Sequence, residues 1–287
     1  MSPAAAPKTR ESLLSRSAAM LVMGVCTIYF LVPVWWLFVG SSKSRGQFID
    51  TDPLWFAEFR LFDNIGDLLA YRDGVFLVWL ANSLAYTGGA ALLGTLFAAM
   101  CGYALAKFRF PGREILFNVV LSGVLVPATA LALPLFLLFS NFAATNTFWS
   151  VFLPSLVNPF GVYLARIYAA ASVDDELLEA ARLDGAGEVR TFFAISARLM
   201  FPALVTIFLF HFVAVWNNFL LPLVMLSDER LFPVTLGLYS WNTQVNQLPE
   251  LRGLVIVGSL LSIAPLVVAF LSLQRFWRSG LGAGAMK

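Results

Sequence analysis

The sequence reads Glu179-Ala180-Ala181-Arg182-Leu183-Asp184-Gly185-Ala186 within its most highly charged segment. Ten charged residues lie between positions 166 and 198, whereas the whole chain of 287 residues is 59% apolar and only 13% charged. A soluble domain is about 45–50% apolar and about 25% charged. So much apolar surface cannot be enclosed in one soluble core, because the outside of such a core needs polar cover. The composition therefore predicts an integral membrane protein and excludes a soluble enzyme, a disordered chain and a small disulfide scaffold.

Long charge-free runs flank this segment on both sides. A helix needs about 20 apolar residues to cross about 30 Å of hydrocarbon. The runs cover positions 18–40, 75–106, 115–165, 199–227 and 253–274. The third run is too long for one helix, and a polar patch at 140–147 divides it into two. We expect an all-α integral membrane protein with six transmembrane helices and both termini on the same side.

The basic residues predict which side faces the cytoplasm. With the N-terminus inside, 13 of the 19 Lys and Arg residues fall on the cytoplasmic side, as the positive-inside rule favours. The predicted orientation is therefore N-in/C-in. We expect a cytoplasmic segment at 1–17, followed by a single transmembrane domain at 18–287. This domain has a cytoplasmic loop at about 172–202 and outer loops at about 41–74 and 228–252.

The charged segment itself predicts two short helices joined by a sharp corner. Ser172 is a suitable N-cap, and Asp174 and Asp175 fall in a first helical turn, where the helix dipole favours acidic groups. Gly185 is typical of a helix stop, and a second helix follows over about 188–198. On composition alone, an amphipathic linker resting on lipid headgroups is the alternative.

This pair of helices with its turn, which we call the corner, closely resembles the EAA loop of ABC-importer permeases. As in that superfamily, it is followed by Phe192, Ile195, Leu199 and Pro202. Segments similar to the maltose-type (MalG-like) carbohydrate-uptake branch lie at 103–113, 216–223 and 274–287. Two positions depart from the family pattern: Arg198 stands where proline is usual, and Asn218 stands where an acid is usual.

The resemblance implies a type I ABC importer permease (MetI-like) fold in the bacterial inner membrane. It implies three kinds of partner: a second permease subunit, an ABC ATPase dimer and an extracytoplasmic solute-binding protein. The chain contains no G-x-x-x-x-G-K-[ST] motif that would cradle ATP phosphates. We therefore expect a transport subunit that is not an enzyme and holds no cofactor, with ATP and Mg bound by the partner ATPase. The net charge of +2 gives no indication of nucleic acid.

The resemblance assigns the corner to contact with the ATPase. Glu179 would pair with a basic residue of the ATPase, Gly185 would form the turn, and small neighbours would permit close approach. The expected coupling residues are Glu179, Ala180, Ala181, Asp184, Gly185 and Ala186. The C-terminal tail would also reach the ATPase, although a frayed tail is the alternative. Its residues are Gly284, Ala285, Met286 and Lys287.

The second outer loop matches the position of the loop that, in this family, enters the binding protein. Its aromatic and amide groups suit sugar hydroxyls, while an ordinary solvated loop is the alternative. The expected contact residues are Tyr239, Trp241, Asn242, Gln244, Asn246 and Gln247.

His211 is the only histidine and lies within an apolar run. On an uninterrupted helix, His211 and Asn218 lie about 20° apart and share a face. These two residues and Asn217 are candidates for the translocation path, since intramembrane ionisable groups often line pathways. Interhelical hydrogen bonding is the alternative role. One His and the separated Cys26 and Cys101 give no expectation of a metal site.

Three rival functions remain open at this point. A permease of the same fold for a non-sugar solute is the nearest. An ion-coupled secondary transporter would usually need intramembrane carboxylates and inverted repeats, which are not evident. A membrane enzyme would need a catalytic constellation that the apolar runs lack.

Overall fold

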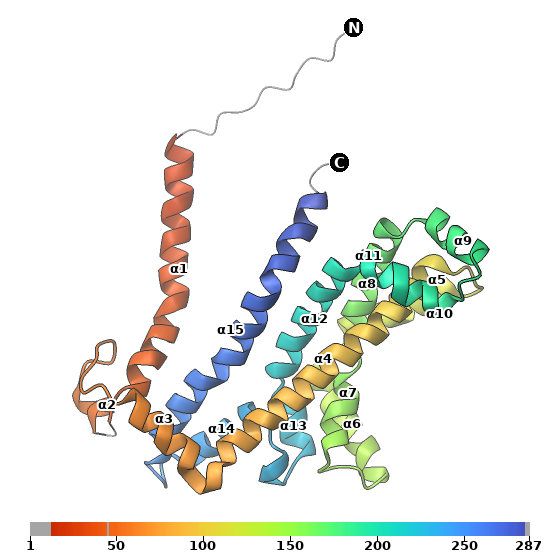
Figure 1. Cartoon of the computed structure of the whole chain (residues 1–287). Helices are drawn as coiled ribbons and strands as arrows, with labels where there is room; N and C mark the ends of the chain where they lie inside the picture. Colours follow the sequence, from red (N-terminus) through yellow and green to blue (C-terminus); the bar gives the residue numbers. More distant parts are fainter. Residues whose placement is uncertain (1–12, 45, 285–287) are drawn as a thin grey trace.

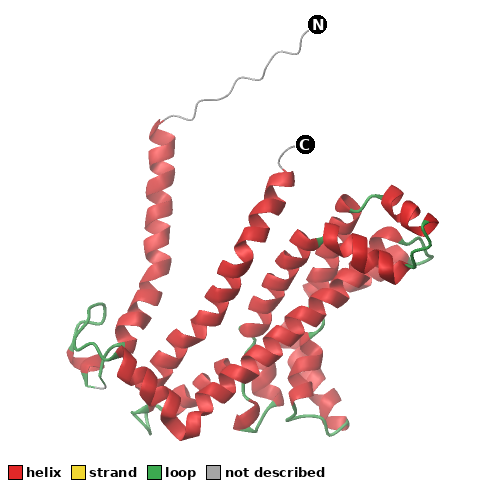
Figure 2. Ribbon diagram, viewed as in Figure 1, coloured by secondary structure: helices red, strands yellow, loops and turns green. Residues whose placement is uncertain are grey.

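The computed structural model describes residues 13–44 and 46–284, and the regular structure of this part of the chain is entirely helical (Figures 1 and 2). Four segments are each long and apolar enough to cross a membrane: Arg16–Ser41, Leu61–Lys107, Phe148–Ser172 and Leu251–Phe276. Two further pairs of helices meet the same test together, but each pair is sharply bent. The expected six spans are therefore reached only when each bent pair counts as one span.

Helix α1 covers Leu13–Ser41, and the short α2 follows at Gln47–Asp50. The expected outer loop at 41–74 also contains a longer helix, α3, Leu61–Ala70, which continues through η1, Tyr71–Gly74, into α4. Helix α4, Val75–Lys107, is the second predicted span. Helices α7 and α8 cover Phe148–Ser155 and Pro159–Ser172, and α15 covers Leu251–Gly284.

The first half of the run 115–165 is broken near its middle. Helix α5, Arg113–Leu125, meets α6, Ala128–Asn141, at 103°. Val126 between them is extended, because the residue before Pro127 is driven out of the helical region. The predicted span here is therefore a bent pair of helices rather than one continuous helix, and the Val-Pro pair carries the signal for the break.

The run 199–227 is also interrupted. Helix α12, Phe201–Trp216, meets the preceding helical segment Glu188–Leu199 at 83°. It ends at Trp216, and a separate short helix, α13, begins at Leu220 and ends at Met225. The predicted continuous span is therefore wrong beyond Trp216. The chain then passes through η3, Glu229–Leu231, to α14, Val234–Gln244.

Helix α4 is the central element of the bundle, packed against α8, α12 and α14. Small residues on α4 allow this close approach: a Cβ at Gly102 would lie 2.5 Å from the Cβ of Ala165 on α8. Ala90 and Ala98 on the same helix are buried. Small residues at such intervals are typical of helices that pack closely in membranes.

The start of α1 and the end of α15 point toward the same end of the molecule as the corner, whereas α3 and α14 lie at the opposite end (Figure 1). This arrangement agrees with the expected placement of both termini on one side. Following the predicted N-in/C-in orientation, we call the first of these the cytoplasmic end and the second the outer end. Apolar side chains of α1 between positions 16 and 36 are exposed, as expected for a surface in a membrane.

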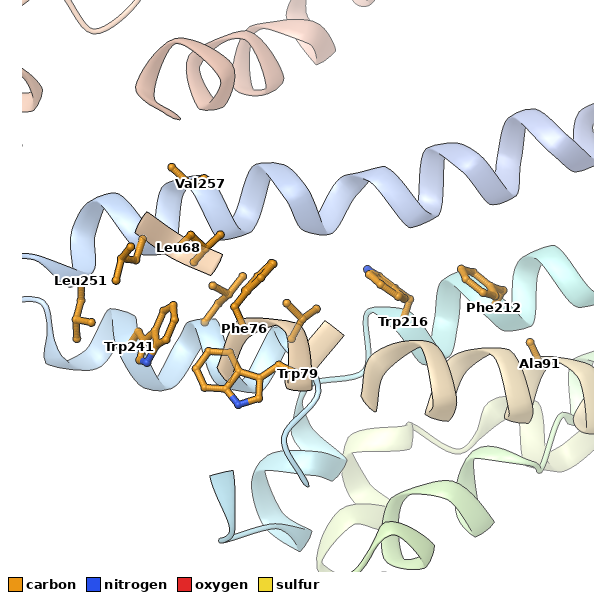
Figure 3. Packing of buried hydrophobic residues seen from close by; sticks show 12 residues of the cluster. Leu68, Phe76, Trp79, Ala91, Phe212, Trp216, Trp241, Leu251 and Val257 are labelled. Carbon is orange, nitrogen blue, oxygen red and sulfur yellow. The ribbon is translucent and has the colours of Figure 1, made fainter. Parts of the chain in front are cut away.

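Two buried clusters hold the ends of the bundle. At the outer end, side chains from α3, α4, α12, α14 and α15 pack together (Figure 3). At the cytoplasmic end, α4 and α8 enclose residues of the corner, including Leu178 and Phe192. The corner is therefore attached to the bundle through the inner end of α4.

Candidate functional site

The corner consists of α9, Asp175–Leu183, followed by α10, Glu188–Thr191. A π-helical turn at Phe192–Ser196 (η2) and the short α11, Ala197–Leu199, continue the second arm. Two helices joined by a corner were predicted. The predicted N-cap was wrong, because the Ser172 hydroxyl donates to Tyr168 O within α8, and Asp174 occupies the N-cap position instead.

Backbone hydrogen bonds form the turn between the two arms. Gly185 N–H donates to Arg182 O at 3.0 Å, and Ala186 N–H donates to Ala181 O at 2.9 Å. These two bonds form a Schellman motif, which satisfies carbonyls at the helix end. Gly185 has φ +77°, a left-handed backbone conformation that residues other than glycine adopt only with strain.

The corner presents one face to the bundle and the other to the outside. Leu178, Ala181 and Phe192 are buried, and the Phe192 ring lies 5.2 Å from that of Tyr103 on α4. Glu179 and Ala180 are exposed, and so are Asp184 and Gly185. Leu183 is 90% exposed, and exposed apolar groups also occur at Leu177, Val189 and Phe193.

Five of the six expected coupling residues are thus at least partly accessible, whereas Ala181 faces the protein interior. The assignment of Ala181 to an external contact was wrong, because the helical spacing that follows Leu178 turns it inward. Glu179 makes no salt bridge with any residue in the described part of the chain. Its carboxylate is available to an external cation.

Two ion pairs support the corner. Arg182 on α9 contacts Glu188 on α10 at 2.8 Å, closing the turn. Lys107, the last residue of α4, contacts Asp175, the first residue of α9, at 2.7 Å. The hydrogen bond from the Lys107 ammonium, together with its charge, holds the pKa of the Asp175 carboxyl below its usual range. The sequence analysis counted Lys107 among the cytoplasmic basic residues and did not predict this contact.

The predicted ATPase contact of the C-terminal tail falls largely outside the described residues. Gly284 is the last residue of α15, while Ala285, Met286 and Lys287 lie beyond the described part.

The expected outer loop is mostly a helix. Tyr239, Asn242 and Gln244 lie on α14, and only a short connection, 245–250, separates α14 from α15. Asn242, Gln244, Asn246 and Gln247 are exposed, and Tyr239 is 45% exposed. Trp241 is 1% exposed, so its assignment to a contact surface was wrong. It belongs to the outer core, where Trp79 on α4 lies beside it (Figure 3).

His211 joins two helical segments inside the bundle. It is 7% exposed, and its Nε2 lies 2.9 Å from Ser155 O at the end of α7. Because a carbonyl only accepts, this contact requires the Nε2 proton on the ring. The structure therefore supports the interhelical hydrogen bond that was the alternative role for His211.

The two asparagines after α12 do not share its face with His211, because the helix has already ended. Asn217 is exposed, and its Nδ2 donates to Val213 O, which closes the helix end. Asn218 lines a cavity of about 10 Å³ together with Ser83, Thr87 and Ser155. This volume is about that needed by one water molecule. The expected polar stripe from His211 to Asn218 is therefore wrong, since it assumed an uninterrupted helix.

The class of protein that this architecture defines is a helical, multi-pass membrane protein with an exposed helical corner at one end. Residues 90–279 match the family described as "Binding-protein-dependent transport system inner membrane component". The chain belongs to this family of inner-membrane transport components. Catalysis is not the role of the family, and the ATPase of such a system is a separate chain.

Several curated relatives match along nearly the whole chain. The arabinooligosaccharides transport system permease protein AraQ of Bacillus subtilis is 33% identical, over 95% of this chain and 96% of the relative. The lactose transport system permease protein LacG of Rhizobium radiobacter is 29% identical, over 91% and 92%. The osmoprotective compounds uptake permease protein GgtD of Synechocystis is 31% identical, over 92% and 91%.

A solved structure has the same fold. The crystal structure of a bacterial ABC transporter involved in the import of the acidic polysaccharide alginate contains a chain that matches with a TM-score of 0.80. The match covers 93% of this chain and 99% of that one, at 21% sequence identity. The helical permease fold is therefore established.

Proposed function

We propose that this chain is one permease subunit of an ABC importer for a carbohydrate: an oligosaccharide, a sugar or a glycerol-phosphate-like solute. In this proposal, the α9–α11 corner docks on an ATPase subunit and moves when the ATPases close around ATP. The bundle then alternates between inward-open and outward-open packings, a switch between discrete arrangements.

The accessible face of the corner is the observation that carries the proposal. A turn fixed by its own backbone hydrogen bonds presents Leu183, Glu179 and Ala180 to the outside, away from the membrane-embedded part of the bundle. An apolar side chain that is 90% exposed at a rigid corner, next to a free carboxylate, suits a protein partner with an apolar cleft and a basic rim.

The carbohydrate class is supported by the relatives rather than by a binding pocket. Relatives named for arabinooligosaccharides and lactose match over more than nine-tenths of this chain. One relative is named for the uptake of osmoprotective compounds, so a non-sugar solute is the second candidate for the transported molecule.

The partners follow from the same proposal. A second permease completes a heterodimer around the path, an ATPase dimer binds ATP and Mg, and an extracytoplasmic binding protein delivers the solute. The chain itself needs no cofactor. The outer residues Tyr239, Asn242, Gln244 and Asn246 are proposed contacts for the binding protein, and the tail from Gly284 to Lys287 is a proposed contact for the ATPase.

Affinity purification of the tagged chain from detergent-solubilised membranes, followed by mass spectrometry, tests the assembly. We expect a second permease, an ATPase and a binding protein to copurify. Ligand screening of that binding protein, with oligosaccharides against compatible solutes, then identifies the solute class. A chain that purifies alone, even when glutaraldehyde is added before lysis, contradicts the proposal.

Two variants test the corner within the same complex. Glu179→Lys reverses the free charge, and Gly185→Pro places a ring where φ is +77°. Both are expected to uncouple uptake while the protein stays in the membrane. Normal uptake by both variants would contradict the coupling role proposed for the corner.

A further inference from the structure

Helix α4 connects the corner to the outer end of the bundle as one continuous element. Its 33 residues span about 50 Å at 1.5 Å per residue. It is packed along its length against α8 and α12, with small residues at the contacts. An element so closely packed moves as a unit, because packed interiors transmit displacement rather than absorb it.

At its inner end, α4 is fastened to both arms of the corner. Lys107 Nζ lies 2.7 Å from an oxygen of Asp175 on the first arm, and the Tyr103 ring lies 5.2 Å from Phe192 on the second. The Lys107 side chain is only 8% exposed, whereas that of Asp175 is 71% exposed. The lysine is thus held by the bundle while the carboxylate is held by the corner.

At its outer end, α4 holds the segment 229–234 that leads into α14. Trp79 Nε1 donates to Glu229 O at 3.0 Å, and Asn82 Nδ2 donates to Arg230 O at 2.7 Å. A second set of bonds completes the attachment: Asn82 to Phe232 O, Tyr86 to Leu231 O, and Val234 N–H to Ser83 Oγ. Side chains from two successive turns of one helix thus hold the backbone of this outer segment.

We propose that Lys107 and Asp175 are the positioning pair that fastens the corner to α4, so that α4 transmits displacement of the corner to the outer segment 229–234. This inference rests on the proposed coupling function and adds to it the residues through which the motion enters the bundle. Among the described residues, Lys107–Asp175 is the salt bridge that joins α4 to α9. Arg182–Glu188 lies within the corner, and Arg166–Glu114 joins α8 to α5.

The asymmetric burial of the pair explains why it suits this role. A lysine removed from water and paired with one carboxylate interacts more strongly than two solvated charges do. Reversing Asp175 leaves that lysine facing a like charge, which separates α9 from α4 without altering the backbone hydrogen bonds of the turn. The apolar contacts of Leu178 and Phe192 with the bundle keep the corner folded.

The test uses the whole complex, purified through the tagged chain and reconstituted into vesicles, in a background with Cys26→Ala and Cys101→Ala. Arg230→Cys introduces an exposed thiol in the outer segment. The measurement is its rate of reaction with a membrane-impermeant maleimide, with and without ATP plus vanadate. The ratio of the two rates reports motion at the outer end and needs no transported solute.

In the protein that keeps Lys107 and Asp175, we expect ATP plus vanadate to change the labelling rate of the Arg230→Cys thiol at least threefold. Lys107→Asp and Asp175→Lys should each reduce this change to less than 1.5-fold, with the ATPase still copurifying. The double variant should recover at least half of the change. Recovery is incomplete because each exchanged charge then opposes the dipole of its helix end. The control Asp63→Lys reverses a similarly exposed carboxylate in an outer ion pair and should keep the full change.

The outcomes separate this inference from the proposed function. Single reversals that keep the wild-type change, or a double variant as defective as the worse single one, would overturn the pair's role. Loss of the ATPase from the single variants alone would also overturn it, because the pair would then act in docking rather than transmission. Failure of the ATPase to copurify with the wild-type chain would instead refute the proposed function itself.

Discussion

The indole of Trp241 on α14 packs against that of Trp79 on α4, with ring centroids 4.5 Å apart. Tyr71 contacts the same Trp241 ring edge-on at 5.3 Å. Trp79 in turn donates its Nε1 proton to Glu229 O. This aromatic group ties α14 to the start of α4, so the outer helix is part of the bundle core rather than a mobile loop.

Trp241→Ala should therefore destabilise the protein rather than alter a contact with a binding protein. Removing a large buried aromatic side chain costs about 3–5 kcal/mol. Thermal unfolding of the purified chain in detergent measures this loss. Tyr239→Ala, at an exposed position on the same helix, is the control. Equal stability of the two variants would contradict the core role of Trp241.

Gly185→Ala should strain the corner without creating a clash. A Cβ at Gly185 meets no atom within 4 Å, but φ is +77°. The left-handed conformation costs about 1–2 kcal/mol for residues other than glycine. We expect weaker copurification of the ATPase.

Gly187→Ala provides the matched control, since Gly187 has φ −70° and equally open surroundings. Copurification measured side by side distinguishes conformation from side-chain bulk. Equal losses in both variants would show that bulk, not backbone conformation, matters at this corner.

Gly102→Ala should loosen the contact between α4 and α8. Its Cβ would lie 2.5 Å from Ala165 Cβ and 2.8 Å from Val162 O, so the helices must separate. Overpacking of this kind costs about 1–3 kcal/mol. Gly88→Ala on the same helix meets no atom within 4 Å and should leave the unfolding temperature unchanged or raise it. A Gly102→Ala protein as stable as Gly88→Ala would argue against close packing here.

His211→Leu should lower stability by about 1 kcal/mol, typical of an interhelical hydrogen bond in a membrane. It leaves Ser155 O without its ring donor. His211→Gln keeps a donor and should retain most of the stability. Uptake per folded molecule should be similar in both variants. A large fall in uptake at normal stability would instead place His211 in the transport path.

The Lys107–Asp175 contact should make stability depend on pH in the acid range. Because the pKa of Asp175 is lowered in the folded protein, the contact contributes fully above the unfolded-state pKa of about 4. The contribution is lost as pH falls through the lower folded-state value. Wild type should therefore exceed Asp175→Asn in unfolding temperature at pH 7, and the difference should shrink below about pH 4. A difference that is independent of pH would exclude the charge as its source.

Sequence patterns predicted the elements that depend on local chemistry. Charge-free length located α1, α4 and α15, and Gly185 marked the turn that the structure shows. Hydrophobicity and turn preferences act over a few neighbouring residues, so a single chain displays them directly.

The contacts that depend on three-dimensional packing were not predictable in this way. The polar residues around Trp241 predicted an exposed aromatic side chain in a loop. The structure instead packs it against Trp79, which lies 162 positions earlier in the sequence. The break after Trp216 moved Asn218 off the face of His211, because helix periodicity no longer applies past a helix end. Lys107 and Asp175 meet only because α8 returns the chain to the end of α4.

In the Schellman turn at Gly185, the backbone determines the shape of the corner, and other residues provide its exposed side chains. Main-chain hydrogen bonds from Gly185 to Arg182 and from Ala186 to Ala181 set its angle. The outward side chains of Leu183 and Glu179 take no part in these bonds. Substitutions at the outward positions can therefore accumulate without altering how the chain folds. Under the proposed docking, the partner would meet a surface whose side chains can vary while the backbone of the turn stays constant.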